Sequence, residues 1–348
     1  MSQRTYDREP VLDATEYDLN LDIVQATIVS GHNLNRFHGS HDPWEYLRRF
    51  SGILDHDGRR YPTVAGLLAF ADEPDRWLPG SGIDIARYQH NPSSTGHHGA
   101  TMLPGPTSAR IEQIRGPIFH VIDRAVEVLQ DACTISVYDG PRIVNTLDTP
   151  LNVLRELTTN GVVHRDLRLD GAQVRVQIFP GFIEWISPGR LPPEVFPDEI
   201  PLSLDLLLTA QYARNPTLAQ FLFHRGYIEK FGMGLDDVVA ALREIRRGIP
   251  EFHNDKHSFR VRVTRPTVGK TYDLSTKEGS KRAILAMFDE RPYWRQNEIA
   301  QRLGIPRSSL QRYLRELLAE RQLAATGATN QRIYHRWSAA AHDSQQLL

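Results

Sequence analysis

LRELTTNGVVHRDLRLDG, residues 154–171, holds the polar residues Glu156, Asn160 and His164 at an even spacing of four. A helix turns by about 100° per residue, so these three side chains fall within about 80° of one another on one face. The leucines and valines of the same stretch fall mainly on the opposite face, as in a helix that packs against a core. The stretch therefore predicts an amphipathic helix whose polar face carries an acid, an amide and an imidazole.

The polar face of this predicted helix has the chemistry of a metal–phosphate site. The amide oxygen of Asn160 is a hard ligand of the kind that Mg²⁺ prefers. The carboxylate of Glu156, one turn earlier, can orient or deprotonate a water molecule as a general base does. The plainer alternative is that all three residues lie on the solvent face of a surface helix, and spacing alone favours that alternative.

The letters HRDL at 164–167 also occur in the catalytic loop of protein kinases, but the other kinase motifs are missing. A kinase needs an Asn five residues after the Asp as a metal ligand, and this sequence has Gly171 there. No DFG motif follows, and no glycine-rich nucleotide loop precedes. We therefore reject the kinase interpretation.

The composition of the whole chain is ordinary for a globular protein. Of its 348 residues, 40% are hydrophobic and 24% charged, the net charge is −1, and the length allows two or three domains. The single cysteine, Cys133, excludes an internal disulfide and a CxxC metal site. No apolar run approaches the roughly 18 residues of a membrane helix, and the N-terminus lacks a signal-peptide pattern. We expect a cytoplasmic protein that does not associate with membranes.

The order of predicted elements indicates a central α/β unit. We expect the helix to begin with Thr149 as N-cap and Pro150 at its first position, followed by strands at 172–179 and 182–187. This part then continues with a loop and a helix, and it ends with a glycine-containing loop, another helix and a closing strand. Upstream, the periodicity predicts a long amphipathic helix at about 107–131.

The C-terminal segment 280–337 predicts a winged helix-turn-helix. Pro292 ends a first helix, Gly304 lies in the turn after a second, and Pro306 begins a third. One face of the third helix is apolar, and the other carries Arg, Gln and Ser, which suit base edges and phosphates. The predicted DNA-contacting residues, including one in the wing, are Arg307, Ser308, Ser309, Gln311, Arg312, Arg315 and Arg332. The alternative is a winged helix used for dimerisation or protein contact.

A basic excess accompanies this segment. Residues 267–348 hold 13 Lys or Arg against 8 Asp or Glu, which suggests a polyanionic partner. We therefore expect double-stranded DNA as the partner, and a homodimer on general grounds of symmetry.

Four stretches of the sequence together resemble the GHKL-type ATP-binding module of bacterial transcriptional regulators. They are LRELTTNGVVHRDL (154–167), FIEWISPGRLPP (182–193), ARNPTLAQFLFHRGYIEKFGMGL (213–235) and HSFRVRV (257–263). The resemblance runs from about residue 43 to residue 265 and implies an α/β sandwich with the nucleotide beneath a flexible lid. A Schlafen/AlbA-type DNA-binding domain often precedes this module, and the short segment before the match is too small for one, so we expect that domain to be lacking.

The resemblance implies ATP and Mg²⁺ as cofactors. Glu156 takes the position of the family's general base, and Asn160 that of its metal ligand. The resemblance also implies one loop that meets the adenine and one glycine-containing loop that faces the phosphates. The expected nucleotide-binding residues are Asn160, His164, Ser187, Gly189, Arg214, Asn215, Gly232 and Gly234. The sequence departs from the family at Ser187, since an Asp usually reads the adenine amino group there.

The predicted fold class is α+β: a GHKL-like α/β sandwich preceded by a small α/β region and followed by a winged helix-turn-helix. The expected parts are an N-terminal arm, or short helices (1–42), an N-terminal α/β region (43–140), the ATP-binding module (141–266), a linker (267–279), the winged helix (280–337) and a tail (338–348). We expect an ATP-binding transcriptional regulator in which nucleotide modulates DNA binding. The alternatives are an ATPase of a nucleic-acid defence or repair system, and a degenerate dimer scaffold that binds no nucleotide.

Overall fold

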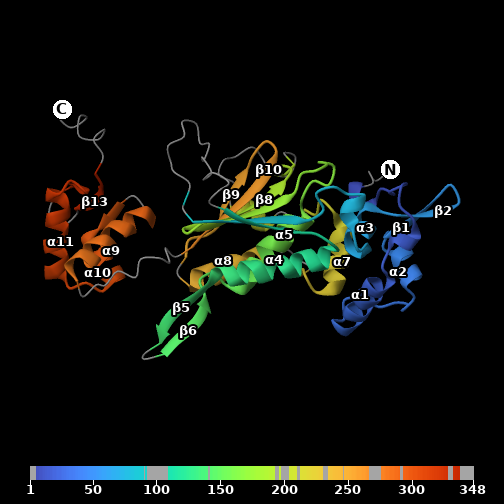
Figure 1. Ribbon diagram of the computed structural model, residues 1–348, viewed down its shortest axis with the longest axis horizontal. Helices are drawn as coiled ribbons and strands as arrows, with labels where there is room; N and C mark the ends of the chain where they lie inside the picture. The colour runs from blue at the N-terminus through green and yellow to red at the C-terminus, as the bar shows by residue number, and fades with distance from the viewer. Residues whose placement is uncertain are drawn as a thin grey trace. The chain divides into compact units, whose positions relative to one another are not determined.

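The computed structural model divides the chain into two compact units, Met1–Thr267 and Val268–Leu348, which we describe separately (Figure 1). The α+β class is confirmed in both units. The residues that the structure describes are 5–89, 91, 109–139, 142–192, 196, 204–209, 212–229, 234–245, 247–265, 276–290, 293–327 and 332–337.

A six-stranded sheet forms the centre of the larger unit, with the strand order β4-β3-β7-β8-β10-β9. β3 and β7 run parallel, and the other neighbouring pairs in this sheet are antiparallel. Apolar residues alternate along the strands, as with Val174 and Val176, so that one face of the sheet is buried. The strands span Ile83–Tyr88 (β3), Ala109–Ile114 (β4), Val174–Ile178 (β7), Phe182–Pro188 (β8), Glu251–Asn254 (β9) and Ser258–Thr264 (β10).

Three helices cover this face of the sheet: α4 (Ile118–Cys133), α5 (Leu151–Val163) and α8 (Gly234–Glu244) (Figure 1). α5 packs against both of the others and against β8. At the centre of this contact the indole N–H of buried Trp185 donates to the hydroxyl of Thr158 at 3.0 Å. α5 is therefore held on several sides, which fixes the direction of its polar residues.

The N-terminal part of the larger unit is mainly helical, with one two-stranded sheet, and it packs onto α7 (Pro216–Arg225). All seven residues of α3 are buried, and the Asp7 carboxylate accepts the N–H groups of Thr217 and Leu218 at the start of α7. The elements are η1 (Tyr6–Arg8), η2 (Glu16–Asp18), α1 (Leu21–Asn33), α2 (Pro43–Arg49), β1 (Ile53–His56), β2 (Arg59–Pro62), α3 (Val64–Phe70) and η3 (Pro74–Arg76).

The structure corrects the expectation of an arm at 1–42. Val24 and Ile28 of α1 are fully buried in the same core as the sheet. The described part of this segment therefore belongs to the larger unit, because its few apolar residues meet a surface that other parts of the chain supply.

The structure also corrects the long helix expected at about 107–131. Ala109–Ile114 form strand β4, and α4 begins only at Ile118. Gly116 has a φ of +120° and Pro117 is the N-cap, so the chain breaks before the helix. Likewise α5 begins one residue later than expected, with Pro150 as N-cap.

A hairpin and a short helix are the remaining elements in the described part of the larger unit. β5 (Thr134–Asp139) and β6 (Arg142–Leu147) form a separate two-stranded hairpin, and α6 (Leu204–Thr209) is a short helix before α7.

The described residues of the smaller unit form three helices and a three-stranded sheet of order β11-β13-β12. Its core includes Leu310 and Leu314 of the third helix, as the apolar periodicity predicts, and Trp294. The first helix begins at Lys277, inside the expected linker, and the expected tail lies outside the described residues. The elements are α9 (Lys277–Glu290), β11 (Tyr293–Arg295), α10 (Gln296–Leu303), α11 (Arg307–Ala319), β12 (Leu323–Thr326) and β13 (Ile333–Arg336).

Replacement of Phe221 by Ala is expected to destabilise the larger unit by about 3–5 kcal/mol, the usual cost of removing a buried phenyl ring. Phe221 is fully buried, and its ring centre lies 4.8 Å from that of Phe70. Urea denaturation followed by tryptophan fluorescence measures the change. Val29→Ala is the control because Val29 is 43% exposed. Equal free energies of unfolding for the two variants would contradict this packing.

Candidate functional site

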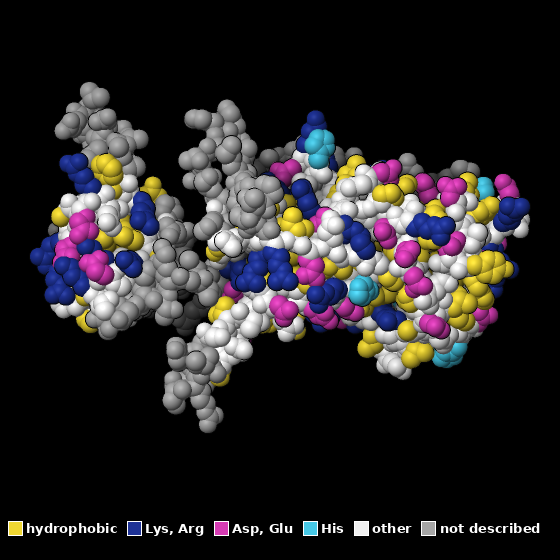
Figure 2. All heavy atoms as spheres, in the orientation of Figure 1, with side chains coloured by type: hydrophobic (Ala, Val, Ile, Leu, Met, Phe, Trp, Pro, Cys, Tyr) yellow, Lys and Arg dark blue, Asp and Glu magenta, His cyan; other side chains and the backbone are white. Residues whose placement is uncertain are grey.

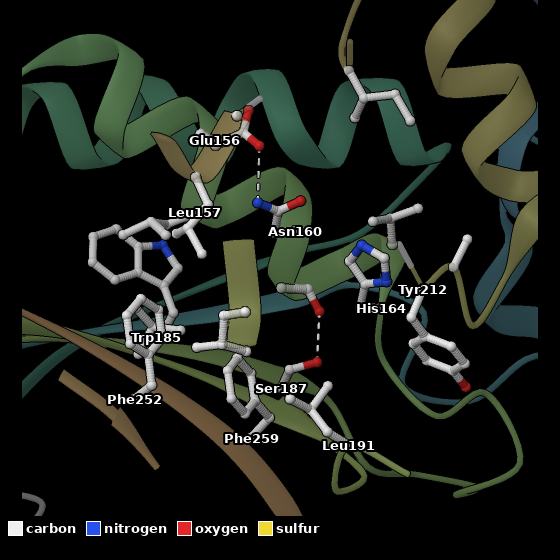
Figure 3. Close-up of a pocket in the computed structure, with 18 of the residues that line it drawn as sticks. Glu156, Leu157, Asn160, His164, Trp185, Ser187, Leu191, Tyr212, Phe252 and Phe259 are labelled. Atoms are coloured by element: carbon white, nitrogen blue, oxygen red, sulfur yellow. Dashed lines mark hydrogen bonds between the residues drawn. The ribbon is translucent and has the colours of Figure 1, made fainter. Parts of the chain in front are cut away.

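A pocket of about 550 Å³ lies between α5 and the sheet. Figure 3 shows Glu156, Asn160 and His164 of α5 on one side, with Ser187 of β8 opposite. The polar residues that were predicted to share one helix face therefore line a single cavity. The surface-helix alternative does not hold for this face of α5.

Glu156 and Asn160 form a hydrogen-bonded pair at the side of the pocket next to α8. The Asn160 amide Nδ2 donates to Glu156 Oε1 at 2.9 Å, which leaves the Asn160 carbonyl oxygen for another partner. Burial raises the pKa of Glu156 above its usual range, although the bond from Asn160 opposes the shift. Gly234, at the start of α8, lies so close to this carboxylate that a Cβ atom there would collide with it.

His164 ends α5 and lines the pocket away from Glu156 (Figure 3). Burial, and then the nearby Arg214 guanidinium, lower the pKa of His164 to about 4. The imidazole is therefore neutral near pH 7 and can both donate and accept a hydrogen bond.

Ser187 and Gly189 border the pocket where β8 ends. The buried Ser187 hydroxyl donates to the carbonyl of Gly161 at 2.7 Å, so its oxygen remains available only as an acceptor. Gly189 has a φ of +89° and lies against Arg214, where a larger residue would be strained and crowded.

Of the three remaining residues predicted to bind nucleotide, two do not line the pocket and one lies outside the described residues. Arg214 and Asn215 are not among the residues that line the pocket. The buried Asn215 amide donates to the carbonyls of Val163 and Arg165 at 2.8 and 2.9 Å, so it holds the end of α5. Gly232 lies outside the described residues.

The wall opposite α5 is apolar and aromatic, which the sequence did not indicate. Trp185, Phe252 and Phe259 line the pocket from three neighbouring strands. The sequence predicted a strand at 182–187, but a strand pattern cannot separate a filled core from a cavity wall.

Glu229 is a second lining carboxylate that the sequence reasoning missed. Arg36 donates to it at 2.5 Å and also donates to the carbonyls of Phe223 and Ile228. The sequence did offer one signal for Glu229, because this residue lies shortly before the segment that contains Gly232 and Gly234. Its charge is balanced by a residue from the N-terminal part of the unit.

Metal binding at the pocket would depend on few protein ligands. Within the part of the chain that the structure describes, no group of three or more His, Cys, Asp or Glu could hold a metal ion. A metal there would use the Asn160 oxygen together with oxygens of a ligand and water.

The outer face of α11 carries the predicted DNA-contacting residues except Arg332, which lies next to β13. Figure 2 shows Lys and Arg side chains over this helix, with Asp and Glu side chains beside them. Glu316, on the same helix, pairs with Lys277 at 2.9 Å, so its charge does not oppose the arginines. The exposed members of the predicted set are Arg307, Ser308, Gln311, Arg312, Arg315 and Arg332, and Ser309 is half-buried.

Two family models match parts of the chain, one in each unit. Residues 171–263 match the family model "Putative ATP-dependent DNA helicase recG C-terminal", an ATPase-like domain, and residues 283–326 match the IclR helix-turn-helix domain. Among the curated proteins, none matches this chain.

One solved structure supports the fold. The DIP2311 protein from Corynebacterium diphtheriae aligns with a TM-score of 0.53 and 17% sequence identity, over 100% of this chain and 67% of that one.

The chain thus has an ATPase-like domain followed by a C-terminal IclR-type helix-turn-helix, which is consistent with a transcriptional regulator and supports DNA binding. Among the described helices, none is both long and apolar enough to cross a membrane.

The stability of the larger unit is expected to fall as the pH decreases from about 6.5 to about 4 because of His164. Its folded pKa lies below its ordinary value, so the unfolded chain binds the proton first and protonation favours unfolding. At pH 5 the loss relative to pH 7 is about 2 kcal/mol. Urea denaturation at both pH values measures it. The difference should shrink in His164→Gln but persist in the control His38→Gln, which alters an exposed histidine. An unchanged difference in His164→Gln would refute the assignment.

Proposed function

We propose that this protein is a cytoplasmic, homodimeric transcriptional regulator that binds ATP with Mg²⁺ in the pocket and DNA through α11, with nucleotide modulating DNA affinity. The observation that carries the proposal is the presence, in one chain, of a pocket bordered by Glu156 and Asn160 and of a helix-turn-helix with an exposed basic face. The pocket would be the sensor and α11 the output.

Several features of the pocket suit ATP and Mg²⁺. Its volume lies within the range of small-molecule sites, and its aromatic wall, with Trp185 and Phe259, suits a flat base. The Asn160 carbonyl oxygen is free of the bond to Glu156 and could bind Mg²⁺. The described lining residues include no Lys or Arg, so Mg²⁺ would supply the positive charge that a triphosphate needs.

An ATPase function is a second candidate, favoured by the Glu156 carboxylate. Its raised pKa and its contact with Asn160 suit a group that accepts a proton from water. If Glu156→Gln abolishes ATP hydrolysis while ATP still binds, the result would favour an ATPase over a regulator that only senses nucleotide.

Asn160→Ala is expected to lower the affinity for ATP in the presence of Mg²⁺ at least about ten-fold, about 1.4 kcal/mol, because it removes the metal ligand. Isothermal calorimetry on the full chain measures the binding. Asn152→Ala is the control, since Asn152 lies on the same helix but is exposed and outside the pocket. Equal loss in both variants would argue against a metal at Asn160. A folded wild type that binds no ATP would favour the scaffold alternative.

Arg312→Ala is expected to weaken binding to a mixed-sequence DNA duplex about ten-fold and to reduce the slope of log affinity against log salt by about 1, as loss of a phosphate contact does. Fluorescence anisotropy over a salt series measures both quantities. Arg282→Ala on α9 is the control, because it removes an arginine that is also exposed but lies on another helix. If the two variants behave alike, α11 is not the DNA-binding surface. Nucleotide modulation would be contradicted if, at fixed salt, ATP left the affinity of the wild-type protein for DNA unchanged.

A further inference from the structure

The hairpin β5–β6 stands apart from the rest of the larger unit. Its strands pair from Thr134 and Leu147 at the base to Asp139 and Arg142 near the tip, and neither strand joins the six-stranded sheet. Figure 1 shows the hairpin projecting from the layer of helices. Apart from their pairing, β5 and β6 have no extensive contact with other described elements. A lone two-stranded hairpin is only marginally stable in water, so this one lacks the support it needs.

The base of the hairpin, in contrast, is held by a buried ion pair. Arg265 donates through Nε and Nη2 to Asp148 Oδ2 at 3.0 and 2.7 Å, and the two side chains are 9% and 0% exposed. Arg265 also donates to the carbonyl of Ala132, and the Asp148 N–H donates to the carbonyl of Cys133, each at 2.9 Å. Both ends of the hairpin are therefore anchored, so its direction is set at the base.

The composition of the hairpin favours pairing with another strand. The stretches 134–138 (TISVY) and 143–147 (IVNTL) contain no charged residue and many β-branched residues. The edge strands of the six-stranded sheet are charged, since β4 carries Arg110 and Glu112 and β9 carries Glu251, whereas the charged residues of the hairpin strands, Asp139 and Arg142, lie only at the end next to the tip. Charges on an edge strand discourage pairing with other chains. Of these edges in the described sheet and hairpin, those of β5 and β6 are the least protected.

A second copy of the chain suits this hairpin. Because the hairpin is antiparallel, an identical hairpin related by a two-fold axis can pair with it edge to edge, and the uncharged stretches place no like charges opposite one another. Arg265, which anchors the base, also lies two residues before the boundary of the two units at Thr267. Contact through the hairpin would therefore join two copies close to where each chain continues toward its helix-turn-helix.

We infer that β5–β6 is a dimerisation arm that pairs with the same hairpin of a second copy. Such a dimer carries two helix-turn-helix units, as a two-fold symmetric DNA site requires. The choice of a second copy draws partly on the proposed DNA-binding function. Association can be measured without DNA or ATP, so failure of the arm is distinguishable from failure of the proposed function.

The first experiment shortens the hairpin but keeps its anchored base. Residues 136–145 are replaced by Asn-Gly, a two-residue turn that joins Ile135 to Thr146, which lie opposite each other. Sedimentation velocity of the full chain, from about 1 to about 100 µM, should give the mass of two chains for the wild type and of one for the variant, with an unchanged melting temperature. A monomeric wild type, or a shortened variant that still dimerises, overturns the inference.

A second experiment leaves the hairpin intact. Asn145→Cys places a thiol at an exposed position of β6, whereas burial raises the pKa of the native Cys133 to about 12 and keeps it unreactive. With diamide as the oxidant, two thiols of paired hairpins lose their protons and join as an intermolecular disulfide. Asp22→Cys, exposed on α1, is the control. Ser136→Cys, at an exposed position of β5, tests the other edge of the hairpin in the same way. We expect covalent dimer well above the control in at least one of the two variants, and yields equal to the control in both overturn the inference.

Discussion

Burial of the C-terminal end of α5 is the constraint on which the larger unit depends. A helix ends with carbonyl groups that have no partner within the helix, and burying them is costly unless other groups donate to them. Ser187 donates to the carbonyl of Gly161, and Asn215 donates to those of Val163 and Arg165. The end of β8 and the start of α7 are thereby tied to α5. These ties define the side of the pocket that His164 occupies.

The same burial controls the charges in the pocket. It raises the pKa of Glu156 and lowers that of His164, so both groups move toward their neutral forms. Glu229 is balanced by Arg36. A cavity with so little uncompensated charge and an aromatic wall suits a ligand with a flat apolar part, and a highly charged ligand would need to bring its own counter-ion. The proposed pairing of ATP with Mg²⁺ meets both conditions.

Buried polar contacts also link distant parts of the chain. Asp7 holds the start of α7, Arg36 holds the segment after it, and Arg265 holds the base of the hairpin. A buried ion pair contributes uncertain stability but does define a unique arrangement when both partners are satisfied. In this protein such contacts place the pocket wall and the hairpin relative to the sheet. The proposed nucleotide binding and dimerisation would thus act on one connected framework.

The sequence by itself determined the elements with strong local signals. The spacing in α5, the alternation in β7 and β8, and the apolar face of α11 were predicted because each depends on residues close together in the chain. Isoleucines spaced like a helix at 111–118 were misleading, since Gly116 and Pro117 break the chain there. Only the tertiary structure decided that α1 joins the core and that Trp185 lines a cavity. It also showed that Asn215 caps α5, because burial and partner choice depend on surfaces that meet from distant parts of the chain.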